Sequence, residues 1–287
     1  MKHVSYSQYN VYRTCPHQWK TIYIDGHRIS APNIHFIFGT ALHEVLQLYL
    51  THFYVKTEKD ANELDAQTLL QEKMIGEFDK YKSEGYENFT TANELSEYYM
   101  DGVHIIDWFK KHRKDYFSKK GWKLVGCEVP IDLEIRPGIT FVAYLDIVLE
   151  NDITGKVRIV DFKKSYRGWS PNQKKDPVKR GQLQLYKHFY SKKFNKNLDD
   201  IEIEFIILKQ KIYNYGDFAP KRVQRFAPPQ SGVTIKKLSK DFYKFVDEVF
   251  NEDGTYNTNL EYKKIPSDKN CKYCPFAKTE YCDQIAN

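Results

Sequence analysis

The chain has 287 residues, of which 41% are hydrophobic and 29% are charged. This composition excludes a fibrous or a wholly disordered protein, and the length allows one large domain or two modest ones. The sequence contains no apolar run as long as a membrane-spanning helix, and its polar first residues lack the apolar region of a signal peptide. We therefore expect a cytoplasmic protein without membrane contact. The net charge of +6 is too small to identify a partner by itself.

The first part of the chain has helical patterns. Residues 5–24 read as a short helix interrupted by Cys15-Pro16, because proline breaks a helix interior. A strongly amphipathic helix is predicted over residues 37–54. Residues of about 56–120 are highly charged with helical periodicity, and we expect two or three surface helices there, inserted between the first motif and the strands that follow.

Strand patterns begin at Trp122. Two apolar segments, 122–135 and 139–150, flank an Arg-Pro-Gly turn and predict a hairpin, and a third strand is predicted over 155–163. A helix at 178–194 then leads to a strand at 201–210, and a proline-rich loop precedes a last helix at about 235–250. Short links make the first three strands antiparallel, and the intervening helix allows a parallel crossover to the fourth. The predicted fold class is therefore mixed α/β, with a mixed central sheet flanked by helices.

A basic segment extends from Lys163 to Lys196, where the only acid is Asp176. Aromatic residues are interleaved with its lysines and arginines, at Tyr166, Trp169, Tyr186, Phe189, Tyr190 and Phe194. Cations with stacking side chains suit a phosphate backbone and unstacked bases, so this segment favours nucleic acid as a partner. The alternative is an ordinary solvated basic helix and loop.

Two strands carry carboxylates at positions that call for a partner. Because strand residues alternate faces, Asp161 and Lys163 share one face at the end of their strand, and Asp146 shares a face with Tyr144 and Val148. Paired carboxylates repel unless a divalent cation lies between them, and Mg²⁺ takes carboxylate oxygens together with waters and phosphate. A neighbouring lysine could then orient a water molecule or stabilise negative charge. The alternative is that Asp146 caps a bend and that Asp161 and Lys163 form a surface ion pair.

Two helices supply further polar candidates. His43 lies on the first amphipathic helix, where a neutral imidazole is a suitable extra metal ligand. Gln182 and Tyr186 are four residues apart and therefore on one helix face, from which both could hydrogen-bond a phosphate or a water. Either feature alone would be assigned a structural role.

Taken in chain order, these motifs resemble the PD-(D/E)XK nuclease superfamily and, more narrowly, the RecB-type nuclease domain. The set is His43, Asp146, Asp161-x-Lys163 and Gln182-x-x-x-Tyr186. Two positions depart from the usual pattern, since Ala143 stands where a glycine is common and Asp161 where many members have glutamate. The resemblance implies a restriction-endonuclease-like core in a single domain over residues 1–287.

The resemblance also implies roles. His43, Asp146, Asp161 and the Phe162 carbonyl would bind Mg²⁺ or Mn²⁺, Lys163 would help to activate water, and Gln182 and Tyr186 would support the lysine, the DNA or the scissile phosphate. Glu128, in the first strand, would be an outer member of the site, or would have a structural or surface role. Glu44 should point elsewhere on its helix, and Lys164 should point away from the catalytic face.

The five cysteines have an uneven distribution. Three form Cys271-x2-Cys274-x7-Cys282, a spacing that indicates a metal or cluster site, and Cys15 is the candidate fourth ligand. Cys127 is expected to be a buried, inert thiol. One early and three late cysteines resemble the iron–sulfur subset of these nucleases, which includes AddB-type domains and CRISPR-associated exonucleases. The resemblance implies a [4Fe–4S] cluster that joins the termini, with zinc as the alternative and unliganded cysteines as a third possibility.

We therefore expect a metal-dependent deoxyribonuclease, an exonuclease on single-stranded or frayed DNA ends. DNA repair, recombination and phage DNA processing are all compatible with such an activity. The sequence has no Gly-rich ATP-binding loop of a motor protein, so a helicase or recombinase would be a separate partner. Two alternatives stay open, namely a non-catalytic iron–sulfur subunit that binds nucleic acid and a structure-specific endonuclease.

Overall fold

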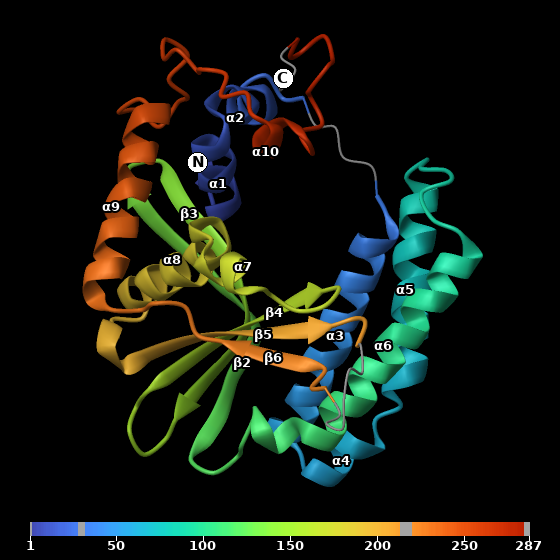
Figure 1. Ribbon diagram of the computed structural model, residues 1–287. Helices are drawn as coiled ribbons and strands as arrows, with labels where there is room; N and C mark the ends of the chain where they lie inside the picture. Colours follow the sequence, from blue (N-terminus) through green and yellow to red (C-terminus); the bar gives the residue numbers. More distant parts are fainter. Residues whose placement is uncertain (1, 28–31, 213–219, 284–287) are drawn as a thin grey trace.

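The computed structural model describes residues 2–27, 32–212 and 220–283, and its strands form one mixed sheet between two helical layers (Figure 1). The six strands of this described part are β1 (Lys2–Val4), β2 (Trp122–Arg136), β3 (Ile139–Asn151), β4 (Val157–Ser165), β5 (Ile201–Lys209) and β6 (Val223–Phe226). The spatial order is β1-β3-β4-β5-β6, and β2 pairs with the other edge of β3.

The predicted strand pairing is confirmed. β2 and β3 form the expected antiparallel hairpin, β4 runs antiparallel to β3, and β5 runs parallel to β4. The parallel step is made by α8 (Pro177–Lys193), a helix that is long enough for the crossover. β1 and β6 were not predicted, because each is very short and β6 lies inside a proline-rich segment.

Each face of the sheet is covered by its own group of helices. One core contains residues from α1 (Tyr6–Thr14), α2 (Pro16–Tyr23), α8 and α9 (Gly232–Val249). The other core contains residues from α3 (Ile34–Val55), α4 (Glu58–Glu63), α5 (Ala66–Ser83) and α6 (Ala92–His112). The two short helices α7 (Pro171–Lys175) and α10 (Asp268–Cys271) lie outside these layers. Within the described residues, no helix combines the length and apolar character required to cross a bilayer.

The inserted helices α4, α5 and α6 contribute buried side chains to the core on the α3 side of the sheet. Leu70 of α5 and Phe109 of α6 are fully buried against α3, and the Phe109 ring lies 6.2 Å from the ring of Phe162 in β4. Burial of an apolar side chain of this size stabilises a fold by about 1.5–3 kcal/mol. The expectation of purely surface helices was therefore too simple, because their apolar faces support the strand that carries Asp161.

The odd-numbered side chains of β3 point into one core in the first half of the strand and into the other core in the second half. In the half nearer the turn, Phe141 and Leu145 pack into the α8-side core, whereas Ile147 and Leu149 pack into the α3-side core. The change occurs at Asp146. Strict alternation through this residue was predicted and is wrong, since Val148 is buried in the same core as Leu145 while Tyr144 is 63% exposed.

Candidate active site

The candidate site lies on an unpaired stretch of the β3 edge. β1 pairs with residues 139–141 of this edge, and β4 pairs with residues 147–150. Residues 142–146 lie between these two ladders, at the point where β4 has already diverged from β3. An unpaired sheet edge presents backbone groups and side chains that a neighbouring strand would otherwise cover. Asp146 is at the end of this stretch, and Asp161 follows Val160, the last β4 residue that pairs with β3.

The Asp146 side chain links β3 to β4 at the point where the backbones of the two strands no longer pair. Its Oδ2 accepts a 2.8 Å hydrogen bond from the backbone N–H of Phe162 and lies 3.5 Å from Nδ1 of His43. Burial raises the pKa of Asp146 to about 6, although the Lys163 charge and the Phe162 N–H act in the opposite direction. In an extended strand the N–H and C=O of one residue point to the same side, so the Phe162 carbonyl also faces the gap.

Asp161 and Lys163 form an ion pair on one strand face, as the period of two predicts. The two atoms Asp161 Oδ2 and Lys163 Nζ are 2.7 Å apart, and Asp161 is only 2% exposed. Burial raises the pKa of Asp161 to about 7 against the attraction of Lys163, and repulsion by Asp146 adds to the increase. Burial acts to lower the pKa of Lys163, but the two carboxylates outweigh it and the pKa is raised, so the side chain is an ammonium.

His43 reaches the same place from α3. Its ring packs edge-on against Phe162 at 5.9 Å between centroids, and burial lowers its pKa while Asp161 opposes that effect. The imidazole is therefore mainly neutral, which is the form that binds metal. Glu44, the next residue, instead pairs with Lys73 of α5 at 2.7 Å and points away, as expected.

Gln47 of α3 and Glu128 of β2 lie next to Asp146, and Gln47 was not predicted. Gln47, one helical turn after His43, donates hydrogen bonds to Glu128 Oε1 at 2.5 Å and to the Asp146 carbonyl at 3.3 Å. Glu128 has a φ of +50°, a left-handed conformation that is strained for a residue with a side chain. The spacing of four from His43 is the signal by which Gln47 could have been found.

Gln182 and Tyr186 lie on one face of α8, as predicted. Nε2 of Gln182 donates a 3.0 Å hydrogen bond to the Tyr186 hydroxyl oxygen. The pKa of Tyr186 is raised by burial, lowered by this hydrogen bond, and raised again by the charges of Asp161 and Asp146. The phenol is therefore close enough to both carboxylates to sense their charge, and it stays protonated.

The residues predicted to bind a metal ion can be compared with their arrangement in the structure. Within the part of the chain that the structure describes, no three histidine, cysteine, aspartate or glutamate side chains already enclose a metal position. Asp161 Oδ2 is buried with the Lys163 ammonium 2.7 Å away, and the neighbouring Asp146 carboxylate repels its charge. The donor set of two carboxylates, a carbonyl and an imidazole fits a divalent cation that retains several waters.

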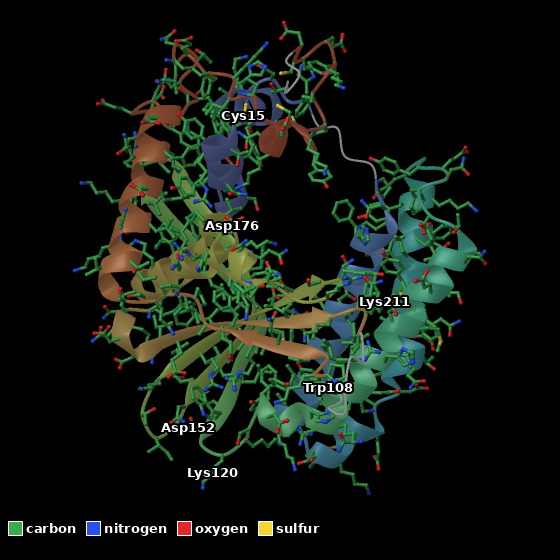
Figure 2. The ribbon with its side chains drawn as sticks, in the orientation of Figure 1. Cys15, Trp108, Lys120, Asp152, Asp176 and Lys211 are labelled. Atoms are coloured by element: carbon green, nitrogen blue, oxygen red, sulfur yellow. The ribbon has the colours of Figure 1, made fainter. Side chains whose placement is uncertain are left out.

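The cysteines of the two chain ends lie at one end of the molecule, where Figure 2 labels Cys15 beside α2 and α10. The amide of Asn270 donates a 3.1 Å hydrogen bond to the Thr14 carbonyl, which joins the residues next to Cys271 and Cys15. The pKa of Cys274 is raised by burial first and also by the nearby Cys15 and Cys282 thiols. Among the described residues, however, no three of these thiols are placed so as to hold a metal ion together. Cys127 lies apart, half-buried beside Thr51.

Lys164 points away from the candidate site, as predicted. Its ammonium lies 3.2 Å from the His35 carbonyl oxygen and 5.2 Å from the Phe38 ring centroid, both on α3. Burial lowers its pKa to about 8. This lysine therefore attaches the end of β4 to the start of α3.

Comparison with known proteins agrees with the geometry. The sequence model of the PD-(D/E)XK nuclease superfamily matches residues 3–282, which include the β3 edge, the three motif elements, Cys15 and the three late cysteines. A comparison with curated proteins found no match. With its motif residues on β3, β4 and α8 around one opening in the sheet, the chain belongs to the PD-(D/E)XK nuclease superfamily.

Proposed function

We propose that this protein is a RecB-type, metal-dependent deoxyribonuclease that acts as an exonuclease on single-stranded or frayed DNA ends. The observation that carries the proposal is the grouping of two buried carboxylates and an ammonium at one sheet opening. Asp146 and Asp161 have raised pKa values, and Lys163 lies 2.7 Å from Asp161. Perturbed acids beside a cation at an opening are typical of a catalytic site.

The metal part of the proposal assigns ligands. Asp146, Asp161, His43 and the Phe162 carbonyl would hold Mg²⁺ or Mn²⁺, which when bound supplies Lewis acidity toward water and phosphate. The mutual repulsion of the Asp146 and Asp161 carboxylates supports this assignment, because a divalent cation between them would relieve it. The Phe162 N–H fixes the Asp146 carboxylate and leaves its second oxygen for a ligand.

Lys163 would act as a cation. Because its pKa is raised, its ammonium stays protonated and is poorly suited to remove a proton from water. It can donate hydrogen bonds to an attacking water and can neutralise charge that develops on the phosphate oxygens. Its side chain is 31% exposed, so a substrate can reach it.

Tyr186 would present a proton to the substrate. Since Gln182 donates to the phenol oxygen, the Tyr186 hydroxyl hydrogen is free to point toward an acceptor such as a phosphate oxygen. The raised pKa keeps that hydrogen in place at neutral pH. Gln182 would therefore act as a positioning residue for Tyr186.

Tyr144 supports an unpaired strand as the substrate. It lies two residues before Asp146, on the part of the β3 edge between the β1 and β4 ladders, and is 63% exposed, so its ring is accessible to a substrate. Exposed rings beside a phosphate-binding site stack on unpaired bases. Strand ends that a helicase or recombinase produces during repair, recombination or phage DNA processing would provide such bases.

The four cysteines would hold a structural [4Fe–4S] cluster that joins the two ends of the chain, with zinc as the alternative metal. The pKa of Cys274 is raised by burial and also by the nearby Cys15 and Cys282, and Asn270 attaches α10 to the end of α1. A bond network between such distant residues restricts the unfolded chain and so stabilises the fold.

The direct test of the proposed activity is cleavage of end-labelled DNA with Mg²⁺ or Mn²⁺. Wild-type protein should degrade linear single strands, and Asp161→Ala should abolish degradation. A circular single strand offers no end, so its cleavage would indicate a structure-specific endonuclease. Binding without cleavage by the wild type would indicate the non-catalytic alternative.

A further inference from the structure

An open groove with a volume of about 610 Å³ lies between α7, the beginning of α8 and the chain that follows β6. Lys174, Lys175 and Arg180 contribute three positive charges to it, and Phe226 contributes an aromatic ring. None of the described residues that line the groove is acidic. A concave surface with charge of one sign concentrates ligands of the opposite sign.

The three cations of the groove are available to a ligand. None of the ion pairs among the described residues includes Lys174, Lys175 or Arg180. Asp176, the one acid of the surrounding basic segment, is used as the cap of α8, where its Oδ1 accepts a 2.8 Å hydrogen bond from Val178 N (Figure 2). A cation without a carboxylate partner loses no ion pair when it binds an external anion.

The wall of the groove is fixed before any ligand arrives. Buried Gln184 donates a 2.5 Å hydrogen bond to the Pro229 carbonyl, and buried Lys187 donates a 3.1 Å bond to the Gln230 carbonyl. The Gln230 side chain in turn accepts a 3.0 Å bond from the Ile203 N–H of β5. The groove is therefore built by α8 and β5 together, and little ordering is required on binding.

The groove lies next to the candidate active site, on the same side of the sheet. Lys163 Nζ is 5.9 Å from the Phe205 ring centroid, and the Phe205 ring stacks on Phe226 with 6.2 Å between centroids. Lys174 Nζ lies 5.8 Å from the Phe226 centroid. Two stacked rings thus separate Lys163 from the first cation of the groove.

We propose that this groove binds the phosphodiester backbone of the nucleic-acid strand whose scissile phosphate lies at Asp161 and Lys163. The proposal rests on the proposed nuclease function and adds a second contact region to it. Successive phosphates need several cations without intervening acids, and the groove supplies them beside the catalytic strand. An acidic protein segment would also be attracted, but the position next to Lys163 favours a strand that continues from the site.

The test compares two triple variants that lose the same charge. The groove variant combines Lys174→Ala, Lys175→Ala and Arg180→Ala, and the control combines Lys80→Ala, Lys82→Ala and Lys111→Ala, which are exposed on α5 and α6. The affinity for a fluorescent oligodeoxythymidine is measured by anisotropy over a series of salt concentrations without divalent metal. The groove variant should raise the Kd more than about tenfold and reduce the salt slope by about 2, at about 0.7 per lost phosphate contact.

The outcomes separate this proposal from the proposed activity. If the groove variant matches the control in affinity and salt slope, the groove does not bind DNA and the proposal is overturned, whether or not the wild type cleaves. If the wild type fails to cleave with Mg²⁺ or Mn²⁺ but the groove variant still weakens binding, the proposed activity fails, whereas the assignment of the groove to a nucleic-acid backbone is supported. A groove variant that loses affinity for a polyglutamate peptide and keeps its affinity for DNA also overturns the proposal.

Discussion

The backbone N–H of Phe162 donates a 2.8 Å hydrogen bond to Oδ2 of Asp146, so one carboxylate both closes the gap between β3 and β4 and faces the candidate metal site. The two roles can be separated by substitution. Asp146→Asn retains an amide oxygen for the Phe162 N–H and should unfold at the wild-type temperature, yet lose DNA cleavage. Asp146→Ala should lose cleavage and also about 1–3 kcal/mol of stability, because the N–H is left buried and unsatisfied. Equal destabilisation in thermal melts would contradict the structural role.

Lys163 and Lys164 are adjacent but face opposite cores, so they form a matched pair. Lys163→Gln should lower kcat by about 10²–10³, the usual cost of removing one charge-stabilising group, with little change in KM. Lys164→Gln should leave kcat close to the wild-type value, since that lysine contacts α3. The measurement is steady-state cleavage of labelled single-stranded DNA. A similar loss of kcat in both variants would show that the effect comes from the strand as a whole.

Tyr144 provides a test of substrate stacking. Tyr144→Ala should raise KM for single-stranded DNA about five- to hundredfold, the range that corresponds to one lost base stack. Tyr144→Phe should behave as the wild type, because it keeps the ring and removes only the hydroxyl. Tyr86→Ala is the control, since Tyr86 is also exposed, at 38%, but lies between α5 and α6. If the alanine and phenylalanine variants of Tyr144 are equal, stacking is not its role.

The sequence predicted what depends on local periodicity. A period of two correctly placed Asp161 and Lys163 together, and a spacing of four correctly placed Gln182 beside Tyr186. The hairpin and the crossover helix follow from turn residues and chain length between strands, which are also local signals. These features required no knowledge of distant contacts.

The unpredicted features depend on contacts between distant segments. The positive φ of Glu128 and the change of face at Asp146 break the period of two without a glycine or proline at either position. The bond from Gln47 to Glu128 joins α3 to β2 and cannot be seen in either segment alone. The unpaired β3 edge exists only because β1 and β4 pair with its two ends.

The His188 side chain should lower the free energy of unfolding in mild acid. Its Nε2 is buried without a hydrogen-bond partner among the described residues, and burial lowers its pKa from 6.5 to about 4. Between these values the unfolded chain binds a proton that the folded chain does not, so this contribution to stability is present above pH 6.5 and is lost as the pH falls toward 4. The loss should be about 2–3 kcal/mol.

The measurement is urea unfolding across that pH range. His188→Phe removes the titrating group and should flatten the decline, whereas His104→Phe, at an exposed position of α6, should leave it unchanged. An unaltered pH dependence in His188→Phe would mean that other groups cause the acid sensitivity.

The cysteine group can be tested by comparing Cys15 with Cys127. After anaerobic reconstitution with iron and sulfide, the wild type should be coloured and contain iron and sulfide, and Cys15→Ser should lose the colour. Cys127→Ser should keep it, because that thiol lies beside Thr51, away from the other four.

The cysteine group should also affect stability. A metal that joins Cys15 to the last cysteines closes a loop of nearly the whole chain, and a cross-link over so long a loop stabilises the folded state by on the order of 5 kcal/mol in a chain-entropy account. Cys15→Ser should therefore also unfold at a clearly lower temperature than Cys127→Ser. Wild-type protein that stays colourless and binds only zinc would replace the cluster with a zinc site, whereas binding of neither metal would remove the metal role of these cysteines altogether.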